Sequence, residues 1–209
     1  MERYKIIKSE EKNIARQHKD VVLHEDIFEI LFKYKKIICN KFDDIRGTLL
    51  IDHLSINIIN PNNKIVIFST TPSVEYNLLT HNLWKHDQGF SISHQINNRF
   101  YSWDTAYKKE YFNELKLTKQ LKHGFTFGFN LSKMINEFQF IYSFATRHPN
   151  SELMDYYRQY INELFSIGNY IYKPMANIHE QLAGTPILVS KNESPLIFSP
   201  FLRLISNNK

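Results

Sequence analysis

Apolar and polar residues alternate along three of four short runs of this chain, and the remaining run, 64–69, holds four consecutive apolar residues. The first two runs, 49–59 and 64–69, flank the turn sequence Asn60–Asn63. The other two, 125–131 and 137–145, alternate phenylalanines with small or polar residues. A period of two is typical of a strand that is buried on one face. The pattern therefore predicts two β-hairpins.

Apolar residues recur at helical spacing before, between and after the two hairpins. The predicted helices cover 24–42, 72–84, 109–122 and the stretch from Ser151 to Leu182. Gly124 is placed to end the third helix, and Pro174 is expected to kink or break the last one. Residues 85–102 show no clean period, which predicts an irregular loop. The stripe of the last helix predicts a core-facing helix, with a dimer seam as the alternative.

This order of elements predicts one α+β domain with an antiparallel central sheet. Helices are expected to sandwich the sheet in three layers, α/β/α, as in PAS and GAF domains. A length of 209 residues fits one domain of ordinary size. We expect a flexible N-terminal arm at 1–20, the folded domain at 21–184 and a C-terminal tail at 185–209.

Composition narrows the class of protein. The chain is 43% hydrophobic, but no apolar run approaches the roughly 20 residues that cross a bilayer. Its one cysteine, Cys39, suits a reducing compartment, so a cytoplasmic location is expected. The net charge of +5 comes from lysines that alternate with acids, which is typical of solvated helix faces. About 25 residues follow Gly184 and hold three prolines, so no helix-turn-helix and no specific DNA binding are expected.

Motifs for catalysis and metal binding are missing from the sequence. It has no H-E-x-x-H, no paired cysteines, no G-x-S-x-G, no Walker loop and no G-x-G-x-x-G. His81, His86 and Asp87 are close together, but their spacing does not place them on one helix face. Cys39 has no base near it in sequence and is expected to fill space in the core. We therefore expect neither an enzyme, nor a metal site, nor a cofactor.

Asp87 and Trp103 are the strongest candidates for a ligand site. Taken singly, Asp87 is an acid after a helix that binds backbone amides, and Trp103 is a packed core residue. Together, a carboxylate that accepts an N–H and an indole that donates one can orient a ligand in an apolar cavity. A closed apolar cavity between them supports a sensor, whereas large side chains in that space support a protein-interaction module.

The stretch from Pro72 to Thr146 resembles the autoinducer-binding domain of LuxR-type quorum-sensing regulators of bacteria, and the likeness extends over roughly residues 20–180. The matching elements are a proline-led helix that reaches Asp87, the Ser102-Trp103-Asp104 element, a charged helix into His123–Phe127, and the Ser143–Ala145 strand. The family's W-x-x-x-Y pair is missing, and Gln88 follows Asp87 where the family has proline.

The resemblance implies roles for several residues. The counterpart of Asp87 accepts the amide of an acyl-homoserine lactone, and that of Trp103 donates to the lactone carbonyl. Gly124 matches the glycine at a strand start, and Ser143 matches a polar pocket residue. Tyr76 and Leu79 lie nearest the family's aromatic pair. The candidate ligand-binding residues are therefore Asp87, Trp103, Tyr76, Gly124, Ser143 and Leu79.

Two functions remain open from sequence. The first is a stand-alone signal sensor that binds a small amphipathic molecule, such as an acyl-homoserine lactone or a related amide. It is expected to act as a homodimer, or as a heterodimer with a full-length regulator. The alternative is an interaction module without a ligand, either a secreted effector or a degenerate remnant on the same fold.

Overall fold

The computed structural model describes residues 20–149 and 152–183. The expected arm, apart from Asp20, and the expected tail at 185–209 lie outside these residues. The described strands are β1 Val22–Leu23, β2 His53–Ile59, β3 Lys64–Ser69, β4 Phe100–Ser102, β5 Phe127–Ile135 and β6 Phe138–Thr146. The described helices are α2 Ile27–Lys33, α3 Lys35–Asp43, α4 Pro72–Thr80, α5 Ile92–Asn97, α6 Trp103–Ala106, α7 Phe112–Lys119, α8 Leu153–Gln159, α9 Ile161–Tyr172 and α10 Ala176–Ala183.

The predicted α+β class and both hairpins are confirmed. The six strands form one sheet in the order β1-β3-β2-β6-β5-β4. The predicted antiparallel pairing is confirmed for β2 to β6, and the two-residue edge strand β1 pairs with β3 in parallel. The short strands β1 and β4 add edges that the sequence did not predict, since two or three residues cannot show an alternating period.

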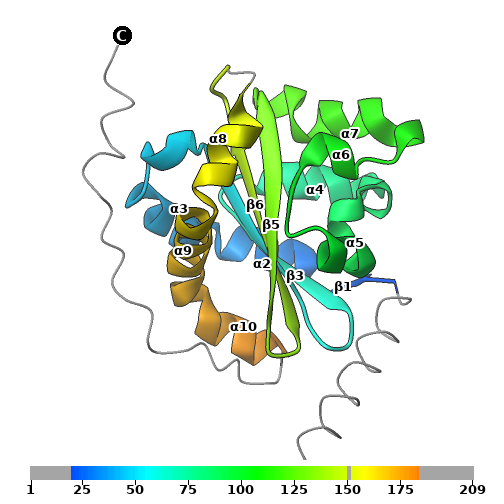
Figure 1. Cartoon of the computed structure of the whole chain (residues 1–209). Coiled ribbons are helices and arrows are strands. Elements are labelled where there is room, and N and C mark those ends of the chain that lie inside the picture. The colour runs from blue at the N-terminus through cyan, green and yellow to red at the C-terminus, as the bar shows by residue number, and fades with distance from the viewer. Residues whose placement is uncertain (1–19, 150–151, 184–209) are drawn as a thin grey trace, which may run out of the picture.

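Helices cover both faces of the sheet, as expected. Figure 1 shows α3, α8 and α9 on one side of the sheet and α4, α5, α6 and α7 on the other. Each layer has its own apolar cluster. The first cluster includes Phe140, Phe144 and Ile167, and the second includes Leu78, Trp103 and Leu115. The stripe on α9 therefore faces the core, which confirms the prediction for that helix.

Successive side chains of β2, β5 and β6 face the two helix layers in turn. The polar side chains therefore face a helix layer, whereas one buried face was predicted. The phenylalanines of β6 face the first cluster, so Gln139 and Ser143 between them face the second. Every residue of β2 and β6 is buried. The prediction of one buried face is wrong, because helices α4 to α7 also cover the polar face of the sheet.

Helix boundaries differ from the expected ones where the pattern was weakest. The helix predicted at 24–42 breaks at Tyr34, with no proline or glycine to mark the break. The stretch 85–102 is not irregular throughout, since it holds two short 3₁₀ turns, α5 and β4. Gly124 adopts φ +68° after the 3₁₀ turn Leu121–His123, as its predicted role as terminator requires. Pro174 lies in the 3₁₀ turn Lys173–Met175, where the predicted break occurs.

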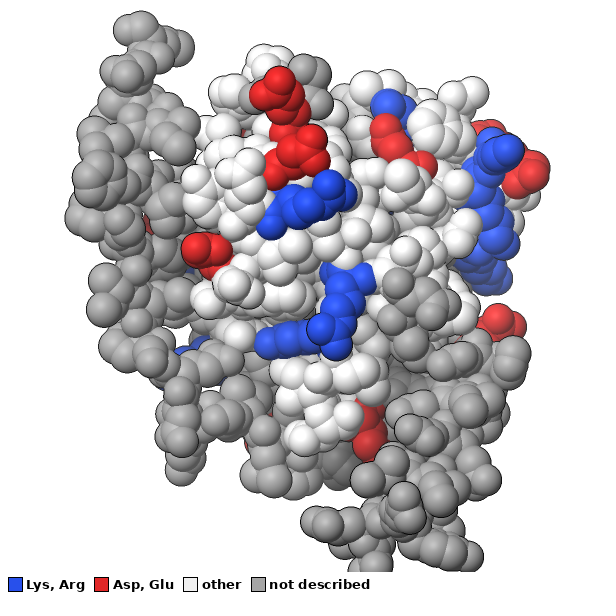
Figure 2. Space-filling view, in the orientation of Figure 1, with Lys and Arg blue, Asp and Glu red and all other residues white. Residues whose placement is uncertain are grey.

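Most charged side chains lie on solvated helix faces, as the interleaved pattern predicted. Lys33 pairs with Glu29 at 2.9 Å, and Arg158 pairs with Asp155 at 3.1 Å. On the face shown in Figure 2, several basic side chains lie against acidic ones. No helix in the described ranges is long and apolar enough to cross a membrane.

A buried histidine on α10 makes stability depend on pH. Burial lowers the pKa of His179 to about 4, and its Nδ1 lies 2.9 Å from the Tyr172 hydroxyl. Below the unfolded pKa of about 6.5, the unfolded chain binds a proton that the folded chain excludes. Folding therefore loses stability from this group as pH falls from about 6.5 to about 4.

We expect His179→Gln to remove this loss while keeping a hydrogen-bonding side chain. Between about pH 7 and about pH 4, the wild type should lose about 3 kcal/mol more unfolding free energy than the variant. Urea unfolding at several pH values measures the difference. Parallel pH profiles for the two proteins contradict it.

Candidate functional site

A stripe of polar side chains crosses the middle of the sheet beneath α4 and α7. Ser55 on β2, Ser143 on β6 and Asn130 on β5 are register partners in adjacent strands. Asn57 lies two residues further along β2, on the same face. All four are buried. Buried polar groups lower stability unless they are paired, so their partners define what this region can do.

Asp87 reaches the stripe from the loop between two 3₁₀ turns. Its Oδ1 accepts the Gly89 N–H at 2.8 Å, and its backbone forms a β-bridge with Tyr107. The hydrogen bond from Gly89 N–H is the backbone-binding role that was predicted for Asp87 taken singly. Its Oδ2 accepts a hydrogen bond from Lys119 Nζ at 2.6 Å. The Asp87 side chain is 1% exposed and that of Lys119 is 5% exposed, so the two charges form a buried ion pair.

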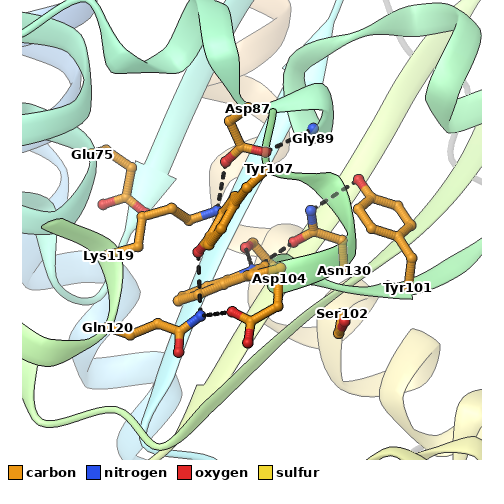
Figure 3. A network of polar contacts seen from close by, with 12 residues as sticks. Glu75, Asp87, Gly89, Tyr101, Ser102, Asp104, Tyr107, Lys119, Gln120 and Asn130 are labelled. Carbon is orange, nitrogen blue, oxygen red and sulfur yellow. Dashed lines mark hydrogen bonds and ion pairs between the residues drawn. The ribbon is translucent and has the colours of Figure 1, made fainter. Parts of the chain in front are cut away.

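Lys119 fills the space between the two predicted ligand-binding groups. Its Nζ lies 4.2 Å from the centre of the Trp103 ring and 5.2 Å from that of Tyr107. Figure 3 shows Lys119 pointing to the Asp87 carboxylate beside the Tyr107 ring. The aromatic faces attract the ammonium electrostatically, so Asp87, Trp103 and Tyr107 together enclose one cation of the chain itself.

The Trp103 indole N–H also has its hydrogen-bond acceptors inside the protein. Its Nε1–H donates to Asn130 Oδ1 at 2.9 Å and to Ser143 Oγ at 3.0 Å. The indole lies flat against β5, where a Cβ added to Gly128 would stand 2.1 Å from Trp103 Cε3. Asn130 extends the network, because its side-chain amide donates to the Tyr101 hydroxyl at 2.8 Å. Burial raises the pKa of Tyr101, which therefore remains protonated.

A second buried pair, His53 and Glu75, borders this network. His53 Nε2 lies 3.5 Å from Glu75 Oε1, and both residues are almost fully buried. Burial raises the pKa of the Glu75 carboxyl, but the His53 imidazole, the Ser69 side chain and a backbone hydrogen bond together lower it by more, so the pKa lies below its usual value. Glu75 Oε2 and Asn57 Oδ1 have no hydrogen-bond partner among the described residues.

Only a very small cavity remains inside this polar network. Its volume is about 10 Å³, and its wall includes Glu75, Asp87, Trp103 and Lys119. That volume holds about one water molecule. The closed apolar cavity that the sensor interpretation predicted between Asp87 and Trp103 is therefore not seen in the described part of the chain.

A larger cleft lies on the outer side of the same loop. Its volume is about 650 Å³, within the usual range for small-molecule sites. Asp87 and Phe90 belong to the wall of both the cleft and the inner cavity. The other lining residues are Asp20, Val21, Trp84, Lys85, Gln88, Ser91, Ile92, Ser93 and Lys108.

The structure brings together some of the six predicted ligand-binding residues and separates the others. Asp87, Trp103 and Ser143 meet in the network. Leu79 is buried in the apolar cluster of the same layer. Tyr76 is 41% exposed and contacts Phe28 and Phe32 away from the network. Gly124 lies outside the lining of both cavities, at the turn before β5.

Several residues of this buried polar network were not predicted from sequence. Lys119 resembles its solvated neighbours on a charged helix, and nothing local distinguishes it. His53, Glu75, Asn57 and Asn130 needed the register of the sheet to be placed. The one available signal was the row of polar residues on alternating strands, which becomes informative once helices are known to cover both faces.

Metal-ligating and thiol chemistry have little support in the described residues. No group of three or more His, Cys, Asp or Glu side chains lies within metal-binding distance there. The Cys39 thiol donates to the Thr70 carbonyl at 3.5 Å, and burial raises the pKa of the thiol. A raised pKa disfavours the reactive thiolate, in line with the predicted role in packing.

Comparisons with known proteins give structural neighbours only. No protein-family model matches the chain, and no curated protein matches it. A structure of SdiA in complex with octanoyl-rac-glycerol is similar at 14% identity and a TM-score of 0.48, over 76% of this chain and 66% of that one. A crystal structure of Escherichia coli SdiA is similar at 11% identity and a TM-score of 0.43, over 94% and 75%.

The match with the SdiA complex thus spans about two thirds of the SdiA chain. Neither TM-score reaches 0.5.

We expect Lys119→Met to lower the unfolding free energy by about 3–5 kcal/mol, because it leaves the Asp87 carboxylate buried without its counter-ion. The matched control is Lys116→Met on the same helix. Lys116 pairs with Asp104 at 2.9 Å, but both are about one third exposed or more, so its loss should cost about 0–1 kcal/mol. Equal effects in urea unfolding contradict the assignment.

Gly128→Ala tests the packing of the indole on the sheet. The added methyl group must displace the Trp103 ring or the strand, which should lower stability by about 1–3 kcal/mol. Near-ultraviolet circular dichroism reports the indole's surroundings and should change with it. Met134→Ala, at an exposed position of β5, is the control. An unchanged melting temperature for Gly128→Ala refutes the close contact.

Proposed function

We propose that the chain is a small-molecule sensor domain that acts by protein association, on a scaffold resembling that of LuxR-type regulators. The observation that carries the proposal is the 650 Å³ cleft, which shares Asp87 and Phe90 with the buried polar network. A ligand in the cleft contacts the same loop that supports the Asp87–Lys119 pair. Binding in the cleft is thereby linked to the packing of α7 against the sheet.

Buried charge supports a binding role over a purely structural one. A buried ion pair contributes little net stability compared with apolar residues of similar volume. One such pair, Asp87–Lys119, lies on one face of the sheet, beside a second buried pair of ionisable groups, His53 and Glu75. Clusters of buried ionisable groups beside a cleft are typical of functional sites.

The second candidate is an interaction module without a ligand, and the packing of Lys119 favours it. Side chains fill the space between Asp87 and Trp103, which is the criterion that separates the two functions at that position. A signal bound there has to displace Lys119 from Asp87. Separating the two charges costs several kcal/mol, and each 1.4 kcal/mol lowers the apparent affinity about tenfold. The outer cleft carries the sensor proposal because a ligand can enter it without this cost.

Ligand-induced thermal shift, recorded together with sedimentation velocity, separates the two functions. The wild type is tested against acyl-homoserine lactones, related amides and simple amphiphiles. A ligand at a hundredfold excess over its Kd stabilises the fold by about 2.7 kcal/mol. For a chain of this size, that raises the melting temperature by about 5–10 °C.

The sensor proposal predicts such a shift for at least one compound, accompanied by a change in association state. Lys119→Ala, which empties the space between Asp87 and Trp103, serves as the comparison. If the wild type binds nothing while Lys119→Ala gains binding of acyl-homoserine lactones, the chain is an interaction module with a self-filled site. If neither protein responds to any compound, the sensor proposal fails.

A further inference from the structure

The outer cleft is built from segments that are far apart in the sequence. Val21 precedes β1, Trp84 and Phe90 come from the two 3₁₀ turns around Asp87, and Lys108 follows α6. Lys108 is held beside this loop because its backbone N–H donates to the His86 carbonyl at 3.0 Å. The cleft wall is therefore fixed by main-chain contacts.

One wall of the cleft is apolar. The Trp84 and Phe90 rings meet edge to face, with centroids 6.1 Å apart. Val21 and Ile92 are buried beside the cleft and complete the wall. Such a wall accepts an aliphatic chain, because contact with it removes apolar surface from water.

The polar groups of the cleft favour an acceptor with negative charge. The Trp84 Nε1–H is buried and has no hydrogen-bond partner among the described residues, and an indole nitrogen can only donate. Lys85 and Lys108 are exposed in the lining, and neither forms an ion pair within the described part of the chain. Lys119 already neutralises Asp87, which leaves Asp20 as the opposing acid of the lining.

We propose that this cleft binds an amphipathic anion, with its aliphatic chain on the Trp84–Phe90 wall and its carboxylate at Trp84 Nε1 and the two lysines. This inference rests on the proposed sensor function and gives the site and the ligand class. It differs from the family resemblance, which implies a neutral amide held between Asp87 and Trp103. The anion leaves the Asp87–Lys119 pair intact.

Titration calorimetry with three probes of equal chain length tests the charge preference. The probes are decanoate, its neutral amide decanamide, and decyltrimethylammonium, all below their micelle concentrations. The wild type should bind decanoate at least about tenfold more tightly than the cation. Trp84→Phe retains an aromatic wall without the N–H and should weaken decanoate about tenfold, which corresponds to the loss of one charge-assisted hydrogen bond.

The double variant Lys85→Gln/Lys108→Gln should abolish the preference for decanoate and leave decanamide within about threefold. Lys116→Gln, which removes one positive charge from α7 outside the cleft, should leave decanoate binding unchanged. Equal or tighter binding of the amide or the cation, with dependence on Trp84, overturns the anion while the sensor function stands. Binding that no cleft variant alters overturns the location. If no probe binds, both this inference and the proposed function fail for amphiphiles.

Discussion

The buried ion pair between Asp87 and Lys119 is the interaction on which the packing of α7 against the polar face of the sheet depends. It joins the loop after α4 to the last turn of α7, over 32 residues of sequence. The ammonium also rests against Trp103 and Tyr107. Because each charge is buried and compensated mainly by the other, α7 cannot move from the sheet without exposing or isolating a charge.

The sheet explains why a polar network exists there at all. In β2, β5 and β6, large apolar side chains point to one helix layer, and serines and asparagines point to the other. Helices α4 to α7 cover this second face, so its polar groups must find partners inside the protein. Trp103 binds Asn130 and Ser143, and Tyr101 binds Asn130. The packed network leaves room for about one water molecule.

Sequence predicted the parts of this architecture that leave a local period. The hairpins, the turn at Gly124 and the break near Pro174 follow from spacing and backbone preference. Asp87 and Trp103 were predicted from their complementary hydrogen-bonding groups and Ser143 from a motif resemblance, and the fold does bring them together. Lys119 could not be predicted, because a lysine on a charged helix looks the same whether it faces water or a carboxylate from a distant loop. The same limit applies to His53 and Glu75, which meet only after β2 and α4 pack.

The domain has an inner site that its own Lys119 fills and an outer cleft that the described residues leave open. Its two tryptophans report these places separately, Trp84 in the cleft and Trp103 in the network. The most direct measurement is a ¹H–¹⁵N correlation spectrum of both indole N–H groups during titration with decanoate. The account predicts that the Trp84 signal moves with saturation and the Trp103 signal stays in place. Movement of the Trp103 signal with a stationary Trp84 signal contradicts it.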